Sequence, residues 1–416
     1  MRRNGPKLAN MSFVSDLRPA AVAAGVTTFI WYAFGALPLQ LDISDQMGLS
    51  AAEASSWMFI IWFSGAATSI LLGLYYRLPL PVTWTVPGLV YLGTLGGQFS
   101  FAEMAAASFA AGFAILLLGA FSVGKRLMAW LPLPIVMGMF AGSVLIYVTR
   151  MVEAAVADAG IAGITVAAYL AGRLIANPRI PPMVFAVFAG GIAIAVAGTS
   201  APQPIVWTAP TLIVPGFEFS IDAIFAVSLP MIVLALGLGN VQGLGFLTAQ
   251  GYRVPVTPIT VAVGLTSVIN AFFGGHAATV ARSGSAIVAG PDAGAPEGRY
   301  WAGLIAAALS LSIAFAAGTV SGLIDILPRS FIVTLAALAI LSSMQDALEK
   351  AFADRLRFGA LVAFVVAATP FTLFSITSAF WSIFAGLIAS LFAERHALLR
   401  HWRGDTAARV AIPNPT

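Results

Sequence analysis

The sequence predicts an all-α polytopic membrane protein, and three observations support this. Of the 416 residues, 59% are hydrophobic and 9% are charged, whereas a soluble domain carries roughly 25% charged residues. Many apolar runs approach the ~20 residues that a helix needs to cross about 30 Å of hydrocarbon. The ten-residue alternation of an outer-membrane barrel is missing. Because helices satisfy their backbone hydrogen bonds internally, the runs are expected to cross as helices.

Apolar runs and helix breakers predict about twelve full spans and two shorter segments, about fourteen in all. The clearest cores of full spans are Ala20–Leu37, Ser56–Leu74, Ala105–Phe121, Met183–Gly198, Ala223–Leu238, Leu304–Val320, Phe331–Ser343 and Ala360–Phe374. The short segments are Val82–Leu95 and Thr279–Gly290. Each is the third apolar segment of its half if the second half starts near Ser220. Interrupted segments at matching places in two halves are typical of a transporter binding site.

Both short segments read as a short strand followed by a half-helix. In the stretch "PLPVTWTVPG", prolines and β-branched residues favour extended backbone, and a helix can begin near Pro87. The second segment runs extended through "HAATV" after Gly274, and its helix begins near Arg282–Ser283. Two such helix N-termini facing each other at mid-membrane would form a positive focus suited to an anion.

Loop charges predict the topology. With fourteen segments and a cytoplasmic N-terminus, nearly all loop Lys and Arg residues fall on the cytoplasmic side and Arg150 falls outside. We therefore expect a multi-pass protein of the cytoplasmic (inner) membrane with both termini in the cytoplasm. Residues 1–17 and 395–416 form the tails, residues 18–200 the first repeat and residues 220–394 the second. Arg282 and Arg329 stay unplaced, at or near membrane depth.

Composition excludes several classes of function. The chain has no cysteine, and two of its three histidines, His396 and His401, lie in the C-terminal tail. Cysteine chemistry is excluded, and a metal site is not expected. The net charge of +4 is spread among loops and does not indicate nucleic-acid binding. No nucleophile–base pair or nucleotide loop stands out, so we expect no catalytic residue and no cofactor, and an enzyme or scaffold is the least favoured class.

Arg282 is the sharpest candidate residue. A charge at mid-membrane costs ~2.5 kcal/mol or more, and a guanidinium cannot lose its proton there. It must therefore face water, an internal carboxylate or an anionic substrate. The plain alternative to substrate contact is a structural ion pair with Glu103 or Asp325.

The other polar candidates surround the same two segments. His276 is the one histidine outside the tail and is a plausible proton carrier, although a packed ring is the plainer reading. The amides of Asn240 and Gln242 can serve a ligand or bond between helices. The remaining candidates are Thr83, Trp84, Thr85, Gly88, Thr279, Ser283 and Ser285.

Three further charged residues read as a solvated helix end, namely Asp346, Glu349 and Lys350. Asp325 and Arg329 are spaced for an (i, i+4) pair with each other.

Four stretches resemble the benzoate/proton symporter (BenE-type) family. They are "YRLPLPVTWTVPG", "NVQGLGFLTAQGYRVPVTPITVAVGL", "FFGGHAATVARSGSAIVAGPDAGAPEGRYWAG" and "TSAFWSIFAGL", in order within Leu17–Ala393. The resemblance implies a seven-plus-seven inverted repeat, shared with nucleobase–cation symporters and sulfate permeases. It also implies a core domain of segments 1–4 and 8–11, a gate domain of segments 5–7 and 12–14, and often a homodimer.

The sequence departs from that family at the second short segment. Thr279 stands where an Asn is expected, and Arg282-Ser283-Gly284 replaces an apolar-to-Thr run. An Arg-Ser pair here resembles the sulfate-permease branch. Our leading hypothesis is proton-coupled import of a small organic anion, an aromatic carboxylate such as benzoate. Its carboxylate would lie between Thr85–Gly88 and Arg282–Ser285. The alternative is a transporter or channel for inorganic anions such as sulfate, bicarbonate or chloride.

Overall fold

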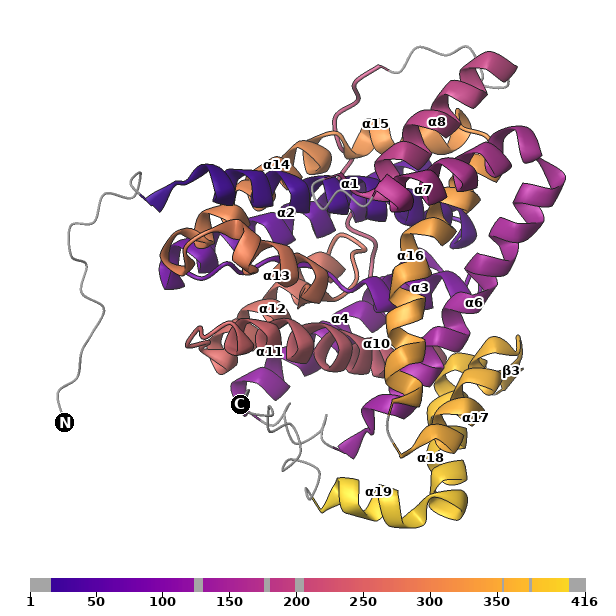
Figure 1. The fold of residues 1–416 in the computed structure, drawn as a ribbon. Coiled ribbons are helices and arrows are strands. Elements are labelled where there is room, and N and C mark those ends of the chain that lie inside the picture. The colour runs from indigo at the N-terminus through magenta and orange to yellow at the C-terminus, as the bar shows by residue number, and fades with distance from the viewer. Residues whose placement is uncertain are drawn as a thin grey trace.

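The chain folds into long, closely packed helices in a computed structural model (Figure 1). The structure describes residues 16–122, 130–175, 180–198, 206–353, 355–373 and 376–403. Most of both predicted tails, residues 1–15 and 404–416, lies outside the described residues.

Seven helical stretches among the described residues are long and apolar enough to cross a membrane, or eight if one bent pair counts as a span. The seven are α1 (Pro19–Gln46), α2 (Ala51–Tyr76), α4 (Phe101–Ala120), α6 (Leu133–Ala157), the stretch Ile221–Ala249 that ends in α11 (Val241–Ala249), the stretch Pro296–Phe315 that contains α14 (Tyr300–Phe315), and α16 (Arg329–Phe352). The bent pair is α18 (Ser378–Ala393) and α19 (Arg395–Trp402), which meet at 113°. The protein is thus a helical, polytopic membrane protein, while the count of about fourteen segments stays a prediction.

The other apolar helices are shorter than a full span. They are the stretch Ala159–Ile175, which ends in α7 (Ile164–Ile175), and then α8 (Pro182–Ala197), α12 (Val256–Ala271) and α17 (Arg357–Ala368). A small helix, α15 (Ala317–Ser321), follows α14. Two short strands, β3 (Thr372–Leu373) and β4 (Ile376–Thr377), follow α17 and pair antiparallel.

The predicted strand and half-helix are confirmed in both short segments. Strand β1 (Val82–Trp84) precedes α3 (Val86–Thr94), and strand β2 (Ala278–Val280) precedes α13 (Arg282–Val288). The two strands pair antiparallel, with Thr83 opposite Thr279. Each strand therefore satisfies the backbone groups that the other leaves open, as burial away from water requires.

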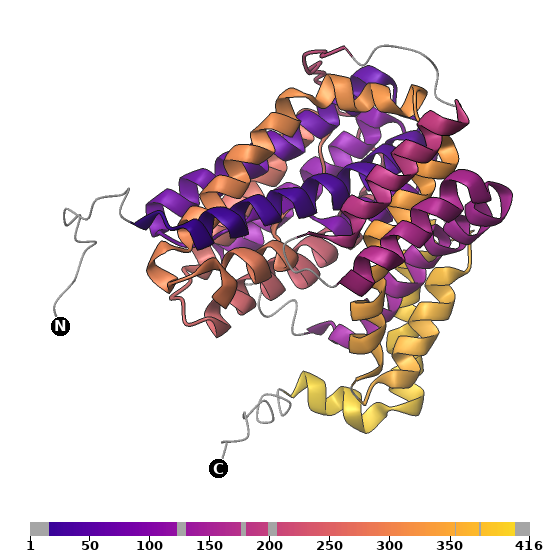
Figure 2. The ribbon, with the colours of Figure 1, turned by 45° about the horizontal axis from the view of Figure 1, so that its top comes forward.

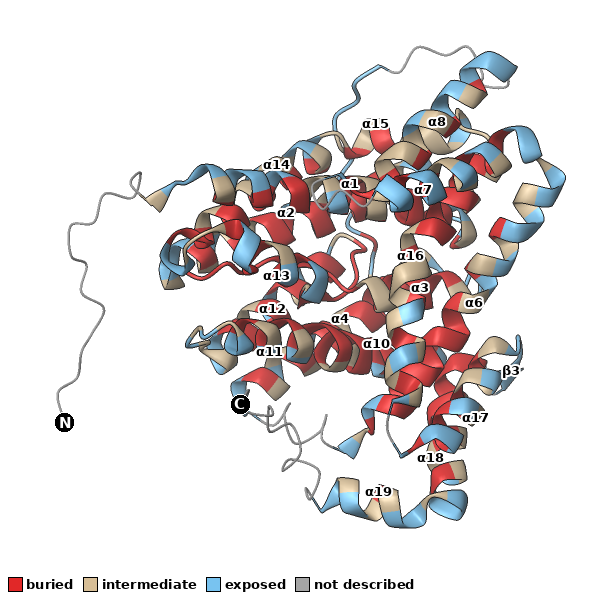
Figure 3. Ribbon diagram, viewed as in Figure 1, coloured by how far each residue is buried: buried red, intermediate tan, exposed pale blue. Residues whose placement is uncertain are grey.

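The helices pack mainly in pairs, and α1 packs on both α14 and α16. Helix α2 packs on α14 and α4 packs on α12, while α6 packs on α16 and α17, α7 on α8, and α17 on α18. Two views agree that the yellow C-terminal helices stand on the far side from the start of α1 (Figures 1 and 2). Buried residues gather where helices meet, and exposed ones lie on outer faces (Figure 3). Many exposed side chains are large and apolar, such as Leu174 and Phe392, as expected of a surface in lipid.

We predict that Gly142→Ala destabilises the protein because α6 and α17 touch at this glycine. An added Cβ would meet the Phe364 carbonyl oxygen and come within 3.0 Å of the Ala368 nitrogen. Overpacking of this kind costs about 1–3 kcal/mol, which would lower the thermal unfolding midpoint in detergent. The control is Gly191→Ala, since Gly191 has open space on α8. Equal midpoints for both variants would contradict this packing.

Candidate functional site

A cavity of about 340 Å³ lies between the two short segments and α1, α6, α11 and α16. Its apolar wall is largely aromatic, and its polar wall includes hydroxyls and one amide. The aromatic and large apolar lining residues are Trp31, Tyr32, Leu39, Trp84, Met137, Phe140, Leu238 and Phe246. The polar ones are Thr83, Gln242, Thr279, Ser283, Ser342 and Ser343. Arg282 and Asp346 are the charged residues among the described lining.

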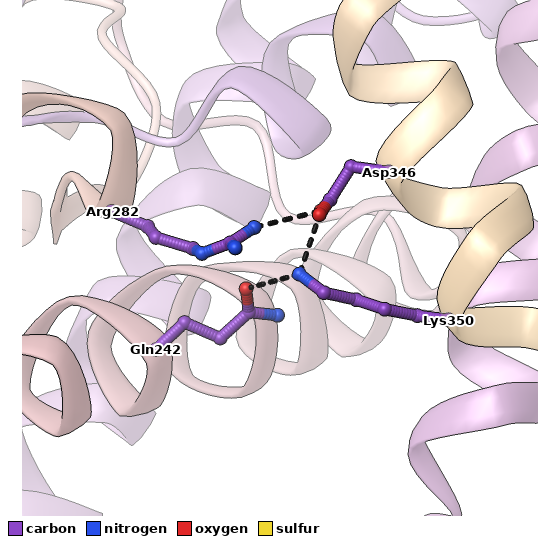
Figure 4. A network of polar contacts seen from close by, with 4 residues as sticks. All are labelled: Gln242, Arg282, Asp346 and Lys350. Atoms are coloured by element: carbon purple, nitrogen blue, oxygen red, sulfur yellow. Dashed lines mark hydrogen bonds and ion pairs between the residues drawn. The ribbon is translucent and has the colours of Figure 1, made fainter. Parts of the chain in front are cut away.

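Four side chains form one polar network at this cavity (Figure 4). The Arg282 Nη1 lies 2.8 Å from the Asp346 Oδ2, and the Lys350 Nζ lies 2.6 Å from the same oxygen. Lys350 also donates to the Gln242 Oε1 at 3.2 Å. Two cations thus share one carboxylate, so the network holds one surplus positive charge. Such a charge attracts an anion, most strongly where water is sparse.

Buried donors without partners lie in the same wall. The Tyr32 hydroxyl, the Trp84 Nε1 and the Gln242 Nε2 are buried and have no hydrogen-bond partner among the described residues. The Trp84 ring lies between Trp62, 4.5 Å away by ring centroids, and Tyr32, 6.2 Å away. Because an unmet buried donor costs roughly 1–3 kcal/mol, these groups are poised to bond to a ligand oxygen or a water molecule.

Strand β2 is held by side chains rather than only by β1. The Val280 nitrogen donates to the Asn240 Oδ1 at 2.9 Å, and the Thr279 hydroxyl donates to the Ala235 carbonyl at 2.9 Å. Asn240 is buried and does not line the cavity. Its amide therefore anchors the strand that positions Arg282.

The other predicted site residues divide between wall and interior. Thr83, Trp84, Gln242, Thr279, Arg282 and Ser283 line the cavity. Thr85 lies behind it and caps α3, accepting from the Gly88 nitrogen at 3.3 Å. Gly88 packs against Met231, and an added Cβ would clash with it. The Ser285 hydroxyl is buried, with no partner in the described parts of the chain.

His276 lies outside this cavity, fully buried beside Trp57 at a ring-centroid distance of 5.6 Å. Its carbonyl accepts from the Asn270 Nδ2 at 3.0 Å. The backbone of Thr85 is a polar neighbour of the ring, but neither ring nitrogen meets hydrogen-bond geometry with a described residue.

The structure changes the expected partners of the charged residues. Arg282 pairs with Asp346 rather than with Glu103 or Asp325. Glu103 instead accepts from the Ser100 nitrogen at the start of α4. Arg329 lies 3.5 Å from Asp45, so the expected pair with Asp325 is wrong.

Asp346 and Lys350 are site residues that the sequence analysis missed, because it read them as a solvated helix end. Asp346 lines the cavity and Lys350 bonds to it from the next turn of α16, while Glu349 between them is exposed. The one available signal was their (i, i+4) spacing in an otherwise apolar helix, which is also common on solvated faces.

Comparisons with known proteins agree on a transporter. The family model described as benzoate membrane transport protein (BenE) matches residues 15–392. A relative named benzoate membrane transport protein, from Acinetobacter baylyi, is 27% identical over 89% of this chain and 94% of its own length. The inner membrane protein YdcO of Escherichia coli is 29% identical over 91% of this chain and 97% of its own length.

Solved structures share the fold at low identity. The transmembrane domain of the cyanobacterial bicarbonate transporter BicA has a TM-score of 0.56 at 16% identity, covering 89% of this chain and 97% of that domain. The murine anion transporter Slc26a9, in an inward-facing state, has a TM-score of 0.61 at 14% identity, covering 95% of this chain and 73% of that one.

We predict that Asn240→Ala costs stability because it leaves the buried Val280 N–H without its acceptor. The expected loss is about 1–3 kcal/mol, read as a lower unfolding midpoint in detergent. Gln242→Ala is the matched control, since its carbonyl bonds to the half-buried Lys350 and anchors no strand. If Asn240→Ala is as stable as Gln242→Ala, the anchoring role is refuted.

Proposed function

We propose, from the premise that the chain belongs to the BenE family of benzoate membrane transport proteins, that it imports a small aromatic carboxylate together with protons. The family match establishes a membrane transporter. The substrate and the coupling ion are our proposal, and benzoate is the first substrate to test.

The surplus positive charge in an aromatic-walled cavity is the observation that supports this substrate class most strongly. A carboxylate can pair with the Arg282 guanidinium, which suits planar oxygen pairs. The ring would then lie against Trp84, Tyr32 and Phe140. A cavity of about 340 Å³ falls at the small end of the roughly 300–1,000 Å³ typical of ligand sites. Helix α13 has seven residues, so we assign the attraction to the Arg282 charge more than to a helix dipole.

The packing supports two moving bodies built from an inverted repeat. The long helices, α18, the shorter apolar helices, α3 and α13 together make about fourteen segments. On that count the contact of α4 with α12 has its counterpart in that of α14 with α2, and the contact of α17 with α18 in that of α7 with α8. We propose that α1–α4 and the segments from Ile221 to α14 form the core, and that α6–α8 and α16–α18 form the gate.

Proton coupling in this proposal rests on one buried histidine. His276 stays our candidate proton carrier because it is the one histidine outside the C-terminal tail and its buried ring nitrogens lack partners among the described residues. Behind the cavity, the Thr85 nitrogen donates to the carbonyl of Ala277, the residue that follows His276.

In proteoliposomes, we expect radiolabelled benzoate uptake to rise with an inward proton gradient and to fall when an ionophore collapses it. Related aromatic carboxylates should compete, and excess bicarbonate, sulfate or chloride should not. The His276→Gln variant should keep benzoate exchange and lose the stimulation. Competition by inorganic anions with no gradient dependence would instead support the inorganic-anion alternative.

We predict that Arg282→Gln reduces benzoate uptake by about 10- to 100-fold. The reason is the loss of a charged hydrogen bond to the substrate, worth about 1.5–3 kcal/mol. Arg253→Gln is the control, because Arg253 is an exposed cation between α11 and α12. The measurement is the initial rate of benzoate uptake at equal amounts of protein. A wild-type rate for Arg282→Gln would show that Arg282 does not bind the substrate.

A further inference from the structure

The Asp346 carboxylate occupies the place on Arg282 that an anionic substrate needs. Its Oδ2 lies 2.8 Å from the Arg282 Nη1, a distance typical of a charge-assisted hydrogen bond. The two residues come from different elements, α13 and α16, and both line the cavity. Their side chains are 45% and 37% exposed, so a soluble anion can reach the pair.

Lys350 offers Asp346 a second cation. It lies one turn further along α16, and its Nζ is 2.6 Å from the same Oδ2. Among the described residues, Asp346 forms ion pairs with these two cations. Glu349, the neighbouring carboxylate, bonds to Gln345 at 2.9 Å instead. Asp346 can therefore release Arg282 and still keep an ion pair.

We propose that Asp346 is an internal competing ligand of Arg282, which the substrate carboxylate displaces onto Lys350. This proposal rests on the proposed function, because it assumes that the anion binds at Arg282. In the empty cavity, two cations share one carboxylate. With the anion bound, Arg282 pairs with the substrate and Lys350 pairs with Asp346. Every charge then has one partner, and no charge is left unpaired.

Displacement also removes a link between the two proposed bodies. The Arg282–Asp346 pair joins α13 in the core to α16 in the gate. The first residue of α16, Arg329, is tied to Asp45 of α1, about 25 Å away along the helix at 1.5 Å per residue. An anion that takes Asp346 off Arg282 removes this ion pair, while α16 keeps its packing on α1. Substrate occupancy thereby changes one contact between α13 and α16.

Opposite changes in affinity from two residues on one helix test the proposal. Benzoate binding to the purified full-length protein is measured by calorimetry for the wild type and for Asp346→Asn, Lys350→Met and Glu349→Gln. Asp346→Asn removes the competitor and should tighten the Kd about tenfold. Lys350→Met removes the second partner of Asp346 and should weaken the Kd about three- to tenfold. Glu349→Gln should match the wild type.

The outcomes separate this inference from the proposed function. If the wild type binds benzoate and Asp346→Asn has an unchanged or weaker Kd, the inference alone is overturned. The inference alone is also overturned if the Kd of Lys350→Met is equal to or tighter than that of the wild type. Absence of wild-type benzoate binding counts against the proposed substrate. In that case the wild type and Asp346→Asn are titrated with bicarbonate and with chloride. Tighter binding of either anion by Asp346→Asn still supports the inference. If neither the wild type nor Asp346→Asn binds any of these anions, both the inference and the proposed function are overturned. Unfolding midpoints show that each variant is folded.

Discussion

The antiparallel pairing of β1 with β2 is the contact on which the rest of the site depends. Both strands lie in the buried interior, where an open backbone N–H or carbonyl has no water to bond with. Neither strand could exist there alone. The strands pair through Val82–Trp84 and Ala278–Val280. This pairing allows extended, non-helical backbone in the buried interior of the protein. The two half-helices that follow then begin at the cavity.

Side chains reinforce this pairing from both sides. The Ser69 hydroxyl accepts from the Val82 nitrogen at 2.7 Å, and the Ser267 hydroxyl accepts from the Ala278 nitrogen at 2.9 Å. Asn240 accepts from Val280. Polar residues on the apolar helices α2 and α12 and on the apolar stretch Ile221–Ala249 thus complete the outer edges of a two-stranded sheet. Their position explains why amides and hydroxyls at this depth serve structure as well as a ligand.

Charge in the cavity follows a different rule. A guanidinium keeps its charge at any physiological pH, so Arg282 needs water or an anion beside it in every state of the transporter. Asp346 meets that need when the cavity is empty. Lys350 prevents Asp346 from neutralising the site fully, and the remaining positive charge lets the site attract an anion from water. A single carboxylate between two cations therefore combines stability with binding capacity.

Local sequence features determined the class of protein and the broken segments. Apolar runs require helices in lipid, and the prolines of "PLPVTWTVPG" and the glycines before "HAATV" stop a helix from forming whatever surrounds them. Both effects act within a few residues, so they can be read without the fold. Arg282 was identified in the same way, since a fixed charge in an apolar run needs a partner.

Only the tertiary structure decided which partner. Asp346 lies 64 residues beyond Arg282, and its spacing to Lys350 fits a solvated helix end as well as a cavity wall. The position of Asn240 outside the cavity wall was open for the same reason. Which face of a helix meets which neighbour depends on how all the helices pack, and no short stretch contains that information.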